Sequence, residues 1–235
     1  MTSFTFRPIG TIRSCFPEKF GIPRQPGLAP DASAVLEIHR SYQNHEAFRH
    51  LELFSHIWVL FVFHRCLRKE WKATVRPPRL GGNRRVGVFA SRSGFRPNPI
   101  GQSAVELLTI EKSPGKISLH LKGVDLLDGT PVLDIKPYLP YADSLPQARH
   151  GFAPGPPPKA MAVRFSEQAA HTCRSLEAQS YPRLERLIVD LLALDPRPGY
   201  APGKNTFGMR LWDLNIRFEI HDDHIEVTSI ETVER

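Results

Sequence analysis

A stretch rich in proline and glycine, residues 140–159, separates two parts of the chain whose hydrophobic patterns differ. Before it, short segments with β-branched and aromatic residues alternate with turn residues, which is typical of antiparallel sheets. After it, apolar residues recur every three or four positions, which is typical of amphipathic helices. We therefore predict a β domain over residues 1–145, a stiff linker over 146–159 and a small α+β domain over 160–235.

The pattern of the first domain predicts a mainly β fold, an antiparallel β-barrel that is closed or nearly closed. Turns rather than long helices join the segments that read as strands. The most apolar of them, residues 55–65, is expected to be a central strand buried on both faces. A short helix capped by Asn44 is expected over residues 44–51. The expected strands are residues 4–13, 34–39, 55–65, 86–90, 103–112, 116–122 and 132–138.

The second domain is expected to contain two helices followed by a closing hairpin. Residues 166–180 and 182–194 have helical periodicity, and residues 209–220 and 225–233 read as the two strands of the hairpin. One face of the second helix should be buried. Its members are Leu184, Leu187, Ile188, Leu191 and Leu192.

Several protein classes are disfavoured by the composition. No apolar run approaches the roughly 20 residues that cross a bilayer, and no secretory signal is evident at the N-terminus. The three cysteines, Cys15, Cys66 and Cys173, are scattered and lack the spacing of metal ligands. The sequence also contains none of the phosphate-binding, dinucleotide-binding, zinc-protease or serine-hydrolase motifs. We therefore expect a reduced, cytoplasmic protein without a metal site and without membrane contact.

The positive charge is concentrated in residues 65–96. This segment holds ten Lys or Arg residues and one acid, Glu70, so its net charge is +9, whereas that of the whole chain is +7. A charge run is usually a solvated face, and that interpretation stays open here. Because the surplus is confined to one segment, a polyanionic partner such as nucleic acid is favoured.

The basic segment ends in a loop that prolines make stiff. Pro97 and Pro99 fix their own φ angles and restrict the residues before them, so the loop holds Arg92, Arg96 and Asn98 in a limited set of conformations. Two guanidiniums and an amide displayed in this way suit a polar planar or anionic ligand. A rigid connector with solvated arginines is the alternative interpretation.

Other polar residues lie at expected turns and strand ends. Gly94 and Gly101 are expected to permit sharp bends in the loop. Arg24 and Gln25 are also flanked by prolines, although a plain surface loop is an equally good interpretation there. His64 ends the most apolar strand, a position at which histidine is more often structural than catalytic.

Three carboxylates, Asp125, Asp128 and Asp134, fall within ten residues of otherwise apolar sequence. Asp128 precedes a glycine, which is the commonest hairpin signal and gives this residue a purely structural interpretation. Three carboxylates are nevertheless more than a turn requires, so Asp128 and Asp134 are candidate functional groups.

These motifs resemble a known family. GVFASR at 87–92, RPNPIG at 96–101, DGTP at 128–131 and DIKPY at 134–138 closely resemble the TsaA family, also called YaeB or TrmO. The resemblance also includes residues 19–20, 23–26, 74–83 and 195–198, and so covers nearly the whole chain. It implies an S-adenosylmethionine-dependent methyltransferase that modifies N6 of N6-threonylcarbamoyladenosine beside the anticodon of tRNA. It also implies a barrel fold and a cofactor bound near a homodimer interface.

The resemblance assigns roles to residues of this sequence. Those expected to take part in catalysis are Arg92, Asn98, Asp128 and Asp134. Those expected to contact the cofactor are Pro23, Arg24, Gln25, Phe63, His64, Arg92, Leu127, Asp128, Gly129 and Thr130. Those expected to contact tRNA are Arg76, Arg79, Arg84, Arg96 and Arg197.

Two questions stay open at this point. Asp128 and Asp134 are both candidates for polarising the attacking nitrogen or for holding cofactor hydroxyls. The second domain either grips the anticodon stem or only supports the barrel, and its turn at residues 195–198 could reach the active site. Two other functions compete with tRNA methylation: a non-catalytic RNA-binding module and a methyltransferase acting on a small molecule.

Overall fold

The computed structural model of the chain describes residues 3–157, 161–197 and 205–233. The end of the predicted linker, residues 158–159, and Pro198 of the predicted turn lie outside these ranges. Two compact units are present. The first, called here the barrel unit, comprises Met1–Arg13, Ser33–Lys122 and Gly129–Pro154. The second, called the C-terminal unit, comprises Ser14–Ala32, Gly123–Asp128 and Gly155–Arg235.

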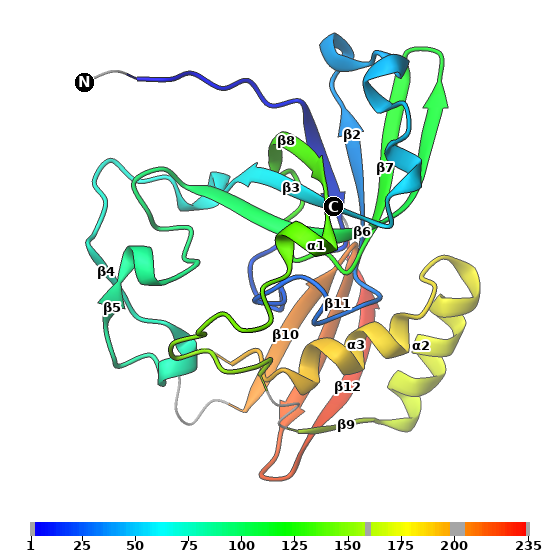
Figure 1. Cartoon of the computed structure of the whole chain (residues 1–235). Helices are drawn as coiled ribbons and strands as arrows, with labels where there is room; N and C mark the ends of the chain where they lie inside the picture. Colours follow the sequence, from blue (N-terminus) through cyan, green and yellow to red (C-terminus); the bar gives the residue numbers. More distant parts are fainter. Residues whose placement is uncertain (1–2, 158–160, 198–204, 234–235) are drawn as a thin grey trace. The chain divides into compact units, whose positions relative to one another are not determined.

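The barrel unit is a closed sheet in which the strands follow the order β1-β2-β7-β6-β3-β8 (Figure 1). Neighbouring strands such as β3 and β6, or β3 and β8, are antiparallel. The prediction of a mainly β, closed barrel is therefore confirmed. The strands are β1 (Gly10–Ser14), β2 (Ser33–Ile38), β3 (His56–Val62), β6 (Ile100–Ser113), β7 (Lys116–Lys122) and β8 (Pro131–Pro137).

Strand β3 faces the core with only one side. Ile57, Val59 and Phe61 are buried, whereas Trp58 and Leu60 between them are half-buried. The expectation that this strand is buried on both faces was wrong, because successive side chains of a barrel strand alternate between its interior and its exterior.

Two expected strands are shorter than their patterns indicated. Strand β1 begins at Gly10, and the aromatic rings of Phe4 and Phe6 before it are exposed. The expected strand 86–90 consists of β5 (Val86–Gly87), which pairs only with β4 (Thr74–Val75), and it then turns into a 3₁₀ helix. Because the partner strand β4 provides only two residue pairs, the alternating sequence after Gly87 has no neighbouring strand, within the described ranges, with which to pair.

The remaining elements of the barrel unit are short. The expected helix over 44–51 is replaced by two 3₁₀ helices, although Asn44 caps the first as predicted by accepting a hydrogen bond from the Glu46 amide at 3.0 Å. The 3₁₀ helices are η1 (Arg40–Tyr42), η2 (His45–Phe48), η3 (Leu51–Leu53), η4 (His64–Cys66), η5 (Pro78–Leu80) and η6 (Val88–Ala90). Helix α1 (Pro140–Asp143) follows β8.

The C-terminal unit combines a sheet of order β10-β11-β12-β9 with two helices (Figure 1). Ser166 caps α2 by accepting a hydrogen bond from the Ala169 amide, and the predicted apolar face of α3 is buried throughout. Helix α2 packs against α3 and β12. The elements are β9 (Ala162–Phe165), α2 (Glu167–Gln179), α3 (Leu184–Ala193), β10 (Thr206–Leu211), β11 (Leu214–Ile220) and β12 (His224–Thr232).

The closing hairpin of the prediction is only part of this sheet. The expected single strand 209–220 is divided by a turn at Trp212, whose φ of 51° is left-handed, so it belongs to both β10 and β11. Strand β9, which pairs in parallel with β12, was not predicted. Four residues of mixed polarity beside a proline-rich stretch carry almost no strand signal.

An early segment of the sequence forms part of the C-terminal unit. The buried carboxylate of Asp31 forms ion pairs with Arg183 Nη1 at 2.9 Å and with Arg186 Nε at 3.1 Å, and both arginines lie at the start of α3. Phe20 stacks on Phe207 of β10 with ring centroids 6.1 Å apart. Contacts of this kind, between residues more than 150 positions apart, have no local sequence signal.

No helix in the described part of the chain is both long enough and apolar enough to span a bilayer.

Two glycines fit against aromatic rings of the barrel. A Cβ atom on Gly101 would lie 2.3 Å from Cζ of Phe61, and one on Gly94 would lie 2.7 Å from Cγ of Phe63. The two phenylalanine rings pack edge to face at 4.9 Å. Neither glycine has a positive φ. The chain does bend at Gly94, as expected, whereas Gly101 lies inside β6. At both positions the missing Cβ atom leaves space for a ring.

Replacing Gly101 with alanine should destabilise the protein, because the added methyl group must displace the buried ring of Phe61. We expect a loss of about 1–3 kcal/mol in the free energy of unfolding, as for other overpacked cores. The measurement is urea unfolding followed by fluorescence. Gly87→Ala is the matched control, since its φ is −59° and nothing lies within 4 Å of the new Cβ atom. Equal stability of both variants would contradict this account of Gly101.

Candidate functional site

The proline-clamped loop, residues 91–99, is called here the site loop. Its far end is fixed to β3 by a hydrogen bond from the Phe63 amide to the Pro99 carbonyl at 2.8 Å. Within it, Arg96 Nη1 donates to the Ser91 carbonyl at 3.1 Å, and the Ser93 amide donates to the Ser91 hydroxyl at 3.3 Å. The prolines, the internal hydrogen bonds and the packing of Gly94 against the Phe63 ring together make the backbone of this loop rigid.

Arg92 and Asn98 are exposed on the site loop. The Asn98 carbonyl accepts the Ile100 amide at 2.7 Å, which fixes the backbone at the entry to β6. A guanidinium donates two parallel hydrogen bonds to a carboxylate or phosphate, and a carboxamide both donates and accepts. This pair can therefore bind and orient a ligand that carries an anionic group and a planar polar edge.

Phe63 and His64 lie where β3 ends. The Phe63 ring rests against Gly94 of the site loop, and its carbonyl accepts the Cys66 amide at 2.8 Å. His64 begins η4 and is half-buried. Within the barrel unit, the structure thus brings the predicted cofactor residues Phe63 and His64 next to the loop that carries Arg92 and Asn98.

Asp134 lies on β8, opposite Leu60 of β3. Its Oδ2 atom pairs with the Lys136 Nζ at 2.7 Å, and its Oδ1 atom accepts the Ile135 amide at 2.9 Å. These contacts hold the carboxylate in a fixed orientation, and its oxygens can accept further hydrogen bonds from a ligand.

Asp128 and its successors form the turn between Leu126 and β8. The Asp128 Oδ1 atom accepts the Ser14 amide at 2.9 Å. The Gly129 amide donates to the Ile12 carbonyl at 2.8 Å, and the Thr130 carbonyl accepts the Ile12 amide at 2.9 Å. The predicted cofactor residues Gly129 and Thr130 therefore use these backbone groups to hold β1.

Within the C-terminal unit, the predicted cofactor residue Arg24 interacts electrostatically with Asp195. Desolvation lowers the pKa of the Arg24 guanidinium, and the Coulombic attraction of Asp195 opposes that shift. Pro23 beside it is buried, and Gln25 folds back so that its amide donates to the Arg24 carbonyl. Leu127 is half-buried. Two motifs that are far apart in the sequence thus meet in this unit.

Arg197 forms a bidentate ion pair with Asp195. Its Nε donates to Oδ1 at 2.8 Å and its Nη2 donates to Oδ2 at 2.7 Å, while its backbone amide also reaches Oδ1 at 3.2 Å. The Arg197 side-chain hydrogen bond is the main cause of the lowered pKa of Asp195, and Arg24 adds a smaller Coulombic contribution. Asp195 is thus held as an anion beside two guanidiniums.

The predicted tRNA contacts Arg76, Arg79 and Arg84 are exposed on the segment that contains β4, η5 and β5. Arg96 is half-buried in the site loop. Sequence reasoning assigned no role to Trp71 and Phe89, two exposed aromatic residues in the same segment. Aromatic residues interleaved with cations were the signal that could have identified them.

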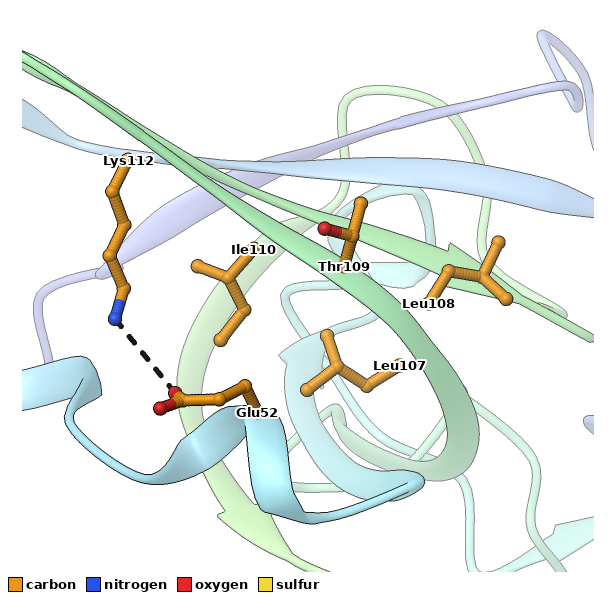
Figure 2. A pocket seen from close by; sticks show the side chains of 6 residues that line it. All are labelled: Glu52, Leu107, Leu108, Thr109, Ile110 and Lys112. Atoms are coloured by element: carbon orange, nitrogen blue, oxygen red, sulfur yellow. Dashed lines mark ion pairs between the residues drawn. The ribbon is translucent and has the colours of Figure 1, made fainter.

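Two open pockets on the barrel unit contain none of the predicted site residues. One, of about 230 Å³, lies beside β6, where Figure 2 shows Lys112 and Glu52 facing each other with Nζ and Oε2 3.9 Å apart. The other, of about 590 Å³, is lined in part by His56 and Tyr138.

Among the described residues, one group has the composition of a metal site. Atoms of His221, His224 and Glu226, at the turn between β11 and β12, lie within 4.8 Å of one another. The ring of His224 contacts the Asp223 carboxylate through Nδ1 at 2.7 Å. This group includes no predicted site residue, and the expectation of a metal-free site stays a prediction.

A closed antiparallel barrel that carries a rigid, cationic loop at the entry to one of its strands is a different class of protein from the doubly wound nucleotide-binding folds. Comparison with known proteins identifies the family. Residues 11–144 match the tRNA-methyltransferase O N-terminal domain, and residues 158–233 match the TrmO C-terminal domain. The chain belongs to the TrmO family.

Relatives and solved structures agree with this assignment. The tRNA (adenine(37)-N6)-methyltransferase of Escherichia coli K12 is 48% identical over 234 residues, which is 98% of this chain and 99% of the relative. A putative S-adenosylmethionine-dependent methyltransferase RcsF of Pseudomonas aeruginosa is 51% identical and covers 90% of each chain. The crystal structure of TrmO from Pseudomonas aeruginosa has a TM-score of 0.82 at 43% identity, covering 98% of this chain and 99% of that one.

Removing the Arg197 guanidinium should raise the pKa of Asp195 towards its ordinary value of 3.8. Because the pKa of this carboxyl is lowered in the folded state, its stabilising contribution is present above pH 3.8 and is lost as the pH falls through the lower, folded-state pKa. In Arg197→Ala, acidification should therefore cause a smaller loss in the free energy of unfolding through protonation of Asp195. Carboxyl ¹³C NMR titration measures the pKa directly. Arg217→Ala is the control, since Arg217 pairs with Glu231; an unchanged Asp195 pKa in Arg197→Ala would contradict this assignment.

Proposed function

We propose that this chain transfers a methyl group from S-adenosylmethionine to N6 of the adenine beside the anticodon of tRNA, and that this adenine already carries a threonylcarbamoyl group. The observation that carries the proposal is the near full-length relationship to the tRNA (adenine(37)-N6)-methyltransferase of Escherichia coli. The exposed arginines between residues 65 and 96 support a polyanionic substrate.

The chemistry of the acceptor explains what the protein has to provide. The N6 nitrogen lies between an adenine ring and a carbonyl group, so its lone pair is delocalised and it is a weak nucleophile. S-adenosylmethionine supplies an activated methyl group, which moves to N6 as its bond to sulfur breaks, and the N6 proton is lost. Fixed orientation of the acceptor and stabilisation of the departing proton are the two contributions left to the protein.

Arg92 and Asn98 are the proposed positioning groups for the acceptor. The threonine part of the modified base carries a carboxylate, which a guanidinium binds through a bidentate pair of hydrogen bonds. The carboxamide of Asn98 suits the polar edge of the base or the carbonyl of the carbamoyl group. Because the site loop is rigid, little conformational entropy is lost when the acceptor binds.

Two roles are proposed for the two carboxylates. Asp134 pairs with Lys136, and Asp128 accepts a hydrogen bond from the Ser14 amide, so each is held in a fixed orientation. Either can accept a hydrogen bond from a ribose hydroxyl of the cofactor or from the N6 proton. The sequence left this choice open, and it stays open.

In the barrel unit, Phe63 and His64 are the proposed cofactor contacts. In the C-terminal unit, taken by itself, Arg24 and Gln25 have the chemistry for the same role. A guanidinium suits the methionine carboxylate, and an aromatic ring suits the adenine face. Gly129 and Thr130 in the barrel unit, and Pro23 and Leu127 in the C-terminal unit, are proposed as further backbone or apolar contacts.

Three further features belong to the proposal. The chain acts as a homodimer, and it works in the cytoplasm, where its tRNA substrate is used. Residues 160–235 are proposed to help position the tRNA. There, Arg197 binds Asp195 through Nε and Nη2, and its guanidinium is the proposed contact with a tRNA phosphate.

Replacing Arg92 with alanine should reduce methyl transfer to threonylcarbamoylated tRNA by about 100- to 1,000-fold, as when a positioning or charge-stabilising donor is removed from an active site. Labelled methyl transfer and nucleoside mass spectrometry measure the product. Arg49→Ala is the matched control, because Arg49 pairs with Glu46 outside the site loop and should leave the rate unchanged.

The choice of tRNA tests the substrate. Transcripts without the threonylcarbamoyl group should be methylated far more slowly than modified tRNA, and equal rates would contradict the proposed acceptor. Calorimetry with S-adenosylmethionine tests the competing RNA-binding module, which predicts no heat of cofactor binding. Addition of excess tRNA to a small-molecule methylation assay tests the remaining alternative.

A further inference from the structure

The basic segment also exposes large aromatic side chains. Phe89 is 71% exposed, Trp71 52% and Phe95 38%. Exposure of a single apolar residue needs no explanation, but several within one short cationic segment mark a binding surface. Neither the predicted contacts nor the site residues account for these rings.

Trp71 and Phe89 are held next to each other by the backbone. Trp71 precedes β4 and Phe89 follows β5, and the pairing of Thr74 with Gly87 aligns these two strands. The hydrogen bond from the Val88 amide to the Ala73 carbonyl at 2.8 Å extends this alignment towards the two rings. The ring centroids are 6.1 Å apart and the planes are inclined by 37°, and both side chains are exposed.

Each ring system has a guanidinium at its side. Arg96 lies over the Phe89 ring, with its Cζ 6.0 Å from the centroid, and Arg68 lies over the Phe95 ring at 4.2 Å. An aromatic face beside a cation matches the alternation of base and phosphate in a single-stranded nucleic acid, since the base stacks on the ring and the phosphate pairs with the cation.

We propose that Trp71 and Phe89 form a platform on which an unpaired base of the tRNA anticodon loop stacks, while Arg68 and Arg96 contact the flanking phosphates. This inference rests on the proposed function for the identity of the RNA. It adds the way in which the loop is held, separately from the chemistry at N6.

A second copy of the chain is a less suitable occupant of the platform. A symmetric contact would place two copies of the same patch against each other, and the segment that carries the patch has a net charge of +9. A polyanion neutralises that charge, whereas a second copy doubles it.

The test compares the tRNA affinities of Trp71→Ala, Phe89→Ala and Trp71→Phe at fixed ionic strength. Loss of one stacked base should raise Kd by roughly 5- to 150-fold in the two alanine variants. Trp71→Phe keeps a ring and should retain most of the affinity. Tyr141→Ala removes an aromatic residue that is 87% exposed outside the basic segment, and it should bind as the unchanged protein does.

Three further readouts identify stacking as the cause. The salt dependence of Kd should keep its slope in Trp71→Ala but become shallower in Arg68→Ala, because only the cation releases counterions. Binding of tRNA should quench the tryptophan fluorescence of Trp71→Phe less than that of the unchanged protein. For Trp71→Ala, KM for tRNA should rise, while kcat at saturating tRNA and the Kd for S-adenosylmethionine should stay near those of the unchanged protein.

The outcomes separate the two proposals. Unchanged tRNA affinity in both alanine variants would overturn the platform even if methyl transfer is normal. A change in sedimentation coefficient in Trp71→Ala would also overturn it, because the rings would then contact a second copy. If the alanine variants lose tRNA affinity while the unchanged protein methylates no tRNA, the platform holds and the proposed reaction fails.

Discussion

The packing of Phe61 and Phe63 against two glycines is the constraint on which the site loop depends. Strand β3 pairs with both β6 and β8, so it fixes where the chain leaves the barrel and where it returns. Gly101 leaves room for the buried Phe61 ring, and Gly94 leaves room for Phe63. The site loop, residues 91–99, therefore packs against the barrel at Gly94, and the sheet restricts the positions of its polar side chains.

The polar groups of the proposed site show two ways in which charge is held. Arg92 and Asn98 are exposed on a rigid backbone, which suits groups that must reach a large substrate. Asp134 and Asp195 are held in ion pairs with Lys136 and Arg197, respectively. At Asp195 the hydrogen bond from Arg197 lowers the pKa of the carboxyl, so this group stays an anion at lower pH and is a weaker base.

The basic segment combines charge with aromatic surface, and the combination carries more information than either part. Exposed arginines alone bind any polyanion and are sensitive to salt. The rings of Trp71 and Phe89 add a preference for unpaired bases over duplex, since a base inside a helix has no free face. A protein that acts on one nucleotide of a loop needs both properties.

The sequence alone predicted the barrel and the C-terminal helices, because residue periodicity and capping residues act locally, and it placed Arg92 and Asn98 on a loop that prolines stiffen. It also contained the family motifs. Only the tertiary structure decided that Asp31 is bound by arginines of α3 and that Arg24 interacts with Asp195. It likewise showed that Gly101 leaves space for the ring of Phe61. These are contacts between residues distant in sequence, and their energies depend on burial and distance, which no local pattern encodes.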